Sequence, residues 1–135
     1  MELLFEAIEI EVSIPSDNAQ VVFSARKMLK NIGFDEVRQY LIASAVSELS
    51  TNIIRYADQG TIYLTQIRND DTLGIEIIAQ DQGPGIADIT QALTENFSSG
   101  NGLGLGLPSV KRIMDEFDIQ SIQGKGTRIR VVKWM

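Results

Sequence analysis

The sequence predicts an α+β two-layer sandwich, in which one mixed, mainly antiparallel sheet carries helices on one face. Two long stretches near the start have apolar residues at helical spacing, one directly after the other. Two pairs of shorter, strand-like stretches follow, and a short turn joins each pair. The chain contains no internal repeat, no low-complexity tract and no linker, so we expect residues 1–135 to form a single domain.

The first expected elements are a strand over residues 8–14 and a helix over residues 17–32. Apolar and polar residues alternate in the strand, and a proline ends it. Ser16 or Asp17 can cap the helix, because their side chains accept hydrogen bonds from backbone N–H groups. Gly33 follows in the position usual for a glycine that ends a helix.

A second helix is expected over residues 35–57, and Gly60 stops it. Its apolar residues fall on one stripe, which consists of Leu41, Ile42, Ala45, Val46, Leu49 and Ile53. Strands over residues 61–68 and 73–80 come next, joined by a turn at residues 69–71.

The last third of the chain should contain one long irregular segment and three regular elements. A short helix over residues 88–94 precedes a glycine-rich stretch, 97–106, that fits no regular element. A helix is expected over residues 108–117, since proline suits its first turn. Strands over residues 118–123 and 127–134 then form a final hairpin.

Charge and composition argue against several classes of function. The formal net charge is -6, so nucleic acid and anionic lipid should be repelled. Cysteine and histidine are both absent, which excludes disulfides and phosphohistidine chemistry within this chain. The glutamate-rich start does not fit a signal peptide, and no apolar run reaches the about 18 residues of a membrane helix. We therefore expect a cytoplasmic protein that binds neither nucleic acid nor membranes.

Glu48 and Asn52 are the first candidates for chemistry. Four residues apart on the second helix, they share a face at the edge of the apolar stripe. A carboxylate there can accept a proton from a nucleophile, and an amide oxygen can ligate Mg²⁺. Taken alone, this pair is also typical of two polar residues at the solvent boundary of a helix.

The second candidate is the run Asp81-x-Gly83-x-Gly85 directly after a strand. Asp81 shares its side of the strand with apolar residues, so its carboxylate faces a buried region and needs a partner. The exocyclic amine of adenine is one such partner, and two glycines let the backbone pass close to a flat ring. An ordinary turn has the same composition, since aspartate and glycine are common turn residues.

The third candidate is the stretch from Gly100 to Pro108, in which glycine recurs at every second position. Its uncovered N–H groups precede a helix, and such a helix N-terminus binds phosphate. This local device would allow an acidic protein to hold a triphosphate, and the stretch could close as a lid. Lys111 and Arg112 could add positive charge, or could lie on a solvated helix face.

The fourth candidate is the turn Gly124-Lys125-Gly126-Thr127, where Thr127 could hydrogen-bond near the same pocket. It also fits an ordinary hairpin turn. The chain lacks the spaced glycine of a P-loop and the signature set of protein kinases.

In the order E-x-x-x-N, D-x-G-x-G, G-x-G-x-G and G-T, these signals resemble the GHKL family of ATPases, which share the Bergerat fold. Gyrase B, heat-shock chaperones, sensor histidine kinases and MutL belong to that family. The resemblance covers nearly the whole chain, and it is greatest for the compact branch of RsbT-type serine/threonine switch kinases of the stressosome. Residues 79–86, 102–108 and 110–117 carry this closer resemblance.

The resemblance implies a role for each matching residue. Glu48 would be the general base, and Asn52 would hold Mg²⁺. Asp81 would bind the adenine amine, and Thr127 would support Asp81. The remaining nucleotide-binding positions would be Gly83, Gly85, Ile86, Gly102, Leu103, Gly104, Leu105 and Gly106. Arg55 stands where many relatives carry a different residue, and it receives no role.

The resemblance also implies the cofactors and partners. ATP and Mg²⁺ would be required, and STAS-domain proteins of the stressosome would be the substrates. A downstream PP2C-type phosphatase would be activated by binding the released kinase. Two alternatives use the same motifs: an anti-sigma kinase that sequesters a sigma factor and phosphorylates its antagonist, and a non-catalytic module whose nucleotide gates partner binding.

Overall fold

The computed structural model describes residues 2–3, 7–86 and 106–135. Its helices are α1 (Asp17–Ile32), α2 (Glu36–Ala57) and α4 (Gly106–Ile113). Its strands are β1 (Glu2–Leu3), β2 (Ile8–Val12), β3 (Gly60–Asn69), β4 (Thr72–Asp81), β5 (Glu116–Ile122) and β6 (Gly126–Trp134).

The strands form one sheet in the order β1-β3-β4-β6-β5. Strands β1 and β2 share one edge of β3, where β2 pairs with residues 60–64 and β1 with residues 67–68. Every pairing between described strands is antiparallel. The expected mainly antiparallel sheet is thus confirmed, and the described part of it contains no parallel pair.

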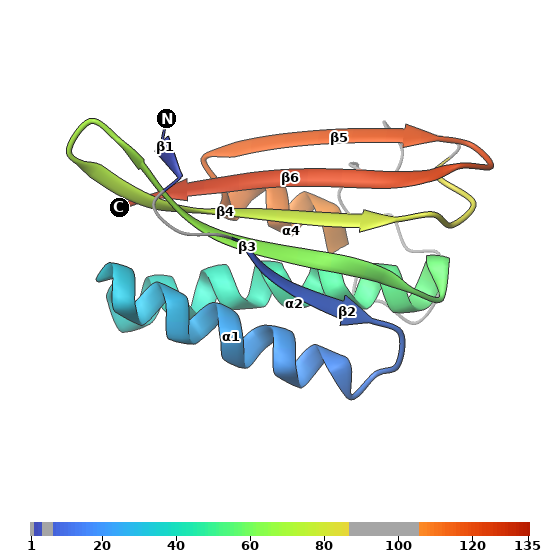
Figure 1. Ribbon diagram of the computed structural model, residues 1–135, viewed down its shortest axis with the longest axis horizontal. Coiled ribbons are helices and arrows are strands. Elements are labelled where there is room, and N and C mark those ends of the chain that lie inside the picture. Colours follow the sequence, from blue (N-terminus) through green and yellow to red (C-terminus); the bar gives the residue numbers. More distant parts are fainter. Residues whose placement is uncertain (1, 4–6, 87–105) are drawn as a thin grey trace.

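The helices cover one face of this sheet, as Figure 1 shows with α2 and α4 behind it. Helix α2 lies between its two neighbours, because it contacts both α1 and α4. The core between the layers is aliphatic, and its fully buried members include Val21, Leu29, Val46, Leu49, Ile62, Leu64, Ile75, Ile77, Val110 and Val131. The predicted two-layer sandwich is confirmed. No helix among the described residues is long and apolar enough to span a membrane.

The first part of the chain differs from the sequence-based expectation in two ways. The first strand ends at Val12 and not at residue 14, because Asp17 turns the chain there by accepting hydrogen bonds from the N–H groups of Ser13 and Ile14. The two-residue strand β1 was not predicted at all.

The helix expected to reach residue 117 ends at Ile113, and β5 begins at Glu116. Asp115 draws the chain into the sheet: its N–H donates to the Val132 carbonyl at 2.9 Å, and its carboxylate accepts from the Trp134 N–H at 2.8 Å. The expected short helix over residues 88–94 and most of the glycine-rich stretch lie outside the described residues.

Candidate functional site

Asp81 is the last residue of β4 and lies on the side of the sheet that faces the helices. It continues the row of Ile75, Ile77 and Ala79, all buried in the core. Its carboxylate is half-buried, and Oδ1 accepts a hydrogen bond of 2.9 Å from the N–H of Gly83. This bond fixes the turn after β4, and no described residue donates a hydrogen bond to the second carboxylate oxygen.

Glycines allow this turn to lie directly on α2. A Cβ atom at Gly83 would be 2.6 Å from the Cβ of Ala57, which is closer than real atoms approach. A Cβ atom at Gly60 would be 2.6 Å from the Gln80 carbonyl oxygen and 2.9 Å from Cγ2 of Ile53. The end of β4 is therefore packed against the last two turns of α2.

Glu48 and Asn52 lie one turn apart on the same helix, both half-buried. Residues at this spacing present their side chains to the same side of a helix, with Cβ atoms about 5–6 Å apart. Neither side chain forms a hydrogen bond or ion pair with another residue in the described part of the chain. The described residues contain no group of three or more histidine, cysteine, aspartate or glutamate side chains placed to hold a metal ion.

Two anchors near the end of β6 show how α2 and α4 are oriented. The Arg38 guanidinium, near the start of α2, donates to the Trp134 carbonyl at 2.6 Å. The carbonyl of Ile113, the last residue of α4, accepts from Lys133 Nζ at 3.0 Å. The two helices therefore run in opposite directions, and the N-terminus of α4 points away from these anchors.

Asn52 and Thr127 lie at the opposite end of the molecule from those anchors. Asn52 is about 21 Å from Arg38 along the helix axis. Thr127 is about 23 Å from Trp134 along β6. Because Thr127 is also the register partner of Asp81, the α2 pair, the end of β4 and the N-terminal end of α4 all lie toward one end of the molecule.

A hydroxyl network joins this region to β5. The hydroxyls of Ser121 and Thr127 are 2.8 Å apart, and Thr127 is buried. Ser121 Oγ also accepts from the Ile86 N–H at 2.7 Å. The hairpin thereby fixes the segment that leaves β4, and it places Ile86 against the core.

Gly85 and Gly126 adopt positive φ angles, +78° and +136°. A Cβ atom at Gly85 would be 2.6 Å from the Ile122 carbonyl oxygen, and one at Gly126 would overlap the Asp81 carbonyl oxygen. Both positions therefore require glycine for backbone conformation and for space. In contrast, a Cβ atom at Gly106 would meet no described atom within 4 Å, so contacts with the described residues do not require glycine there.

The structure thus brings five of the residues that the sequence singled out into one cluster, and three others lie on helices toward the same end of the molecule. Asp81, Gly83, Gly85, Ile86 and Thr127 form one cluster, with Glu48 and Asn52 on the adjoining helix and Gly106 at the start of α4. The predicted positions Gly102, Leu103, Gly104 and Leu105 lie outside the described residues.

Sequence analysis missed Ser121 and Gly60 as parts of this region. Ser121 could have been found from the hairpin, because a turn at residues 123–125 sets it opposite Thr127. Gly60 was interpreted only as a helix stop. Its second role depends on the approach of β4 and α2, and no local pattern reports that approach.

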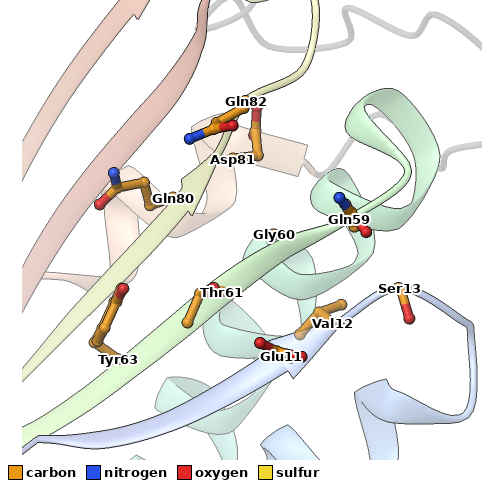
Figure 2. Close-up of a pocket in the computed structure, with 10 residues that line it drawn as sticks. All are labelled: Glu11, Val12, Ser13, Gln59, Gly60, Thr61, Tyr63, Gln80, Asp81 and Gln82. Atoms are coloured by element: carbon orange, nitrogen blue, oxygen red, sulfur yellow. The ribbon is translucent and has the colours of Figure 1, made fainter.

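A hollow of about 320 Å³ lies at the ends of β2, β3 and β4 (Figure 2). Polar side chains dominate its lining, among them Glu11, Thr61, Tyr63, Gln80 and Gln82. Thr61 and Tyr63 alternate with the buried Ile62 and Leu64, so this hollow opens on the sheet face that the helices leave uncovered. Glu48 and Asn52 do not line it, but Asp81 and Gly60, which belong to the region described above, do, so the hollow adjoins that region.

The chain is similar to proteins whose activities are known. Residues 14–133 match the family described as "Histidine kinase-like ATPase domain". The serine/threonine-protein kinase RsbT of Bacillus subtilis (strain 168) is 47% identical over 110 residues, covering 82% of this chain and 83% of that protein.

Anti-sigma F factors are similar over a shorter stretch. The protein from Caldanaerobacter subterraneus subsp. tengcongensis is 35% identical over 100 residues, covering 70% of this chain and 68% of the relative. A solved structure of the mycobacterial sensor histidine kinase MprB covers 95% of this chain and 97% of its own, with 18% identity and a TM-score of 0.49, too low to carry an argument. On the family match and the RsbT identity, the chain belongs to the histidine kinase-like ATPase family, in the branch that contains RsbT and the anti-sigma F factors.

Proposed function

We propose that this protein is a serine/threonine protein kinase that uses Mg-ATP to phosphorylate STAS-domain partner proteins. The observation that carries the proposal is that Glu48 and Asn52 share one side of α2 and lie toward the same end of the molecule as Asp81 and the N-terminus of α4. The similarity to a curated serine/threonine kinase over most of both chains supports it.

The residues at the end of β4 fit an adenine ring. The free oxygen of the Asp81 carboxylate can accept a hydrogen bond from the exocyclic amine. Gly83 and Gly85 present backbone without side chains, and Ile86 offers an apolar contact beside them. Thr127 lies opposite Asp81 on the neighbouring strand β6, where it would help to hold Asp81 in position.

Amide groups are suited to hold the triphosphate. The segment Gly102, Leu103, Gly104, Leu105 and Gly106 leads into α4, whose N-terminal N–H groups and dipole favour a negative charge. Asn52 would hold Mg²⁺ through its amide oxygen, and the bound ion would neutralise charge on the phosphate oxygens.

Glu48 would act on the hydroxyl of the protein substrate. Its carboxylate accepts the hydroxyl proton while the substrate oxygen forms a bond to the γ-phosphorus. The bond between the γ-phosphorus and the bridging oxygen breaks, and ADP leaves with that oxygen. Transfer of this kind depends mainly on positioning and on charge stabilisation, which fixed side chains and amides provide.

We also propose a cellular location and partners for this protein. We place the protein in the cytoplasm as a single kinase domain over residues 1–135, acting on STAS-domain proteins of the stressosome. Once released from them, it would activate a PP2C-type phosphatase by binding it. The similarity to proteins that are themselves kinases or anti-sigma factors is consistent with such partner switching.

The test is transfer of γ-labelled phosphate from ATP to purified STAS-domain proteins. Glu48→Ala should bind ATP normally but transfer phosphate at least about 100-fold more slowly, because a general base contributes that much. Asp81→Asn should lose ATP binding, because its amide cannot replace both carboxylate contacts. Near-normal transfer by Glu48→Ala would reject the role of Glu48.

A second candidate function is that of an anti-sigma kinase, which the similarity to anti-sigma F factors favours. Both functions would use the same nucleotide site, so they differ only in the partner. Pull-down with the ATP-loaded protein distinguishes them: a retained sigma factor supports the second candidate, and a retained STAS scaffold or phosphatase supports the first.

A further inference from the structure

We propose that the outward face of α1 is the docking surface for the phosphoacceptor protein, and that it binds an acidic patch on that protein. The proposed surface consists of Phe23, Arg26, Lys27 and Lys30, which we call the α1 basic face. This inference rests on the proposed kinase function and adds the surface that holds the substrate.

The α1 basic face is defined by helical periodicity. Its members are spaced at positions i, i+3, i+4 and i+7 and are all exposed. Val21, Ala25 and Leu29, on the opposite side of the helix, are fully buried in the core. The four residues are therefore turned away from the protein interior and contribute nothing to its packing.

The charge of this face is opposite to that of the molecule. The whole chain has a net charge of -6, whereas Arg26, Lys27 and Lys30 lie together with no acidic residue among them. None of the three forms an ion pair with any residue that the structure describes. The acidic residue of α1 is Asp17 in its first turn, where its carboxylate accepts from the Ser13 N–H at 2.8 Å.

Phe23 gives the face an apolar anchor. Its side chain is 70% exposed, whereas phenylalanine is among the residues most often buried. Aromatic residues and arginine are enriched where protein interfaces gain most of their binding energy. An acidic partner with a recess for one aromatic ring would complement both features.

The α1 basic face lies beside the helix that carries the proposed base. Helices α1 and α2 run next to each other, as Figure 1 shows. The Asn18 amide donates to the Ser47 hydroxyl at 3.1 Å, and Ser47 directly precedes Glu48. A protein bound along α1 is thus positioned next to the α2 turn from which transfer is proposed.

The same face fits a membrane or a nucleic acid less well. A helix that lies on a lipid surface buries a broad apolar face, whereas the outward side of α1 carries one large apolar side chain, Phe23, among three cations. Nucleic acid would be repelled by the acidic remainder of the molecule. An acidic protein surface of limited area meets neither objection.

The experiment measures binding of purified STAS-domain proteins from the same organism by isothermal titration calorimetry, with a non-hydrolysable ATP analogue present. Binding measured in this way does not require transfer, so failure of docking is distinguishable from failure of the kinase reaction. The variant Arg26→Gln/Lys30→Gln should bind about tenfold more weakly, and so should Phe23→Ser. Added salt should weaken wild-type binding more steeply than binding of the double variant.

The control variant is Asn69→Asp/Gln120→Glu, which lowers the net charge by the same amount at exposed positions on β3 and β5. It should bind like the wild type, and ATP affinity should be equal in all variants. Equal binding by the double variant and its control would overturn the proposal, and so would a wild type that binds no STAS protein. If the double variant lost binding to phosphatidylglycerol vesicles but bound STAS-domain proteins like the wild type, the face would be assigned to lipid and protein docking would be rejected.

Discussion

Gly126 shows how a single residue connects the hairpin to the proposed nucleotide site. Its φ of +136° is one that residues with a Cβ atom rarely adopt, and that atom would overlap the Asp81 carbonyl oxygen. The next residue, Thr127, pairs with Asp81 across the strands. A side chain at residue 126 must therefore displace the backbone of the residue that is proposed to bind adenine.

We predict that Gly126→Ala destabilises the protein and weakens ATP binding. Gly124→Ala is a matched control, because Gly124 also has a positive φ, +83°, but a Cβ atom there would meet no described atom within 4 Å. The control should cost about 1–2 kcal/mol of unfolding free energy from backbone strain alone. Gly126→Ala should cost more, measured by urea denaturation, and equal losses for the two variants would contradict the steric argument.

At the scale of single residues, sequence analysis succeeded where one element determines which way a side chain faces. Helical spacing places Glu48 and Asn52 on one side of α2, and strand alternation places Asp81 with the core. It failed for Ser121 and Gly60, whose roles depend on elements far apart in the sequence. The nucleotide roles of all these residues stay predictions.

At the scale of elements, the starts of α1 and α2 differ although both have a polar cap residue. Asp35 precedes α2 in an extended conformation, and its carboxylate accepts from the Arg38 N–H at 2.9 Å. Ser16 precedes α1 in a helical conformation and makes no capping hydrogen bond. The sequence alone suggested a cap at either Ser16 or Asp17, and the side chain of Asp17 turns back to the preceding residues.

We predict that Asp35→Ala lowers the unfolding free energy by about 1 kcal/mol, the usual value of a helix cap. Ser16→Ala should change it by only a few tenths, since no capping bond is lost. Thermal and urea denaturation of both variants at neutral pH provide the measurement. A larger loss for Ser16→Ala than for Asp35→Ala would show that the hydrogen bond does not determine helix stability here.

The boundary between α4 and β5 could not be predicted from the local sequence pattern. The apolar spacing of residues 108–117 continues smoothly, so the sequence favoured one helix over the whole stretch. The chain instead changes direction at Asp115, which binds the backbone of Trp134 and the Lys133 ammonium at 3.1 Å. Both partners lie at the far end of the chain, and contacts of that kind override local periodicity.

At the scale of the whole molecule, the two-layer fold could be predicted because amphipathic helices and alternating strands can bury their apolar faces only against one another. Strand β1 could not be predicted, because two residues are too few to show a periodicity. Its pairing also depends on the part of the β3 edge that β2 does not occupy. At one end of the molecule the sheet and α2 are in direct contact, because Gly60 and Gly83 have no side chain that would hold them apart.

The proposed nucleotide would contact both layers at that end, α2 and α4 in one and β4 in the other. We therefore predict that Mg-ATP stabilises the whole domain, by about 2.7 kcal/mol at a hundredfold excess over its dissociation constant. For a chain of this size the melting temperature should rise by several degrees. Asp81→Asn should show no such rise, whereas Glu48→Ala, which loses the base but keeps the site, should rise like the wild type. A wild type whose melting temperature is unchanged by ATP or ADP with magnesium would contradict the nucleotide site itself, whereas equal shifts in all three proteins would contradict only the role given to Asp81.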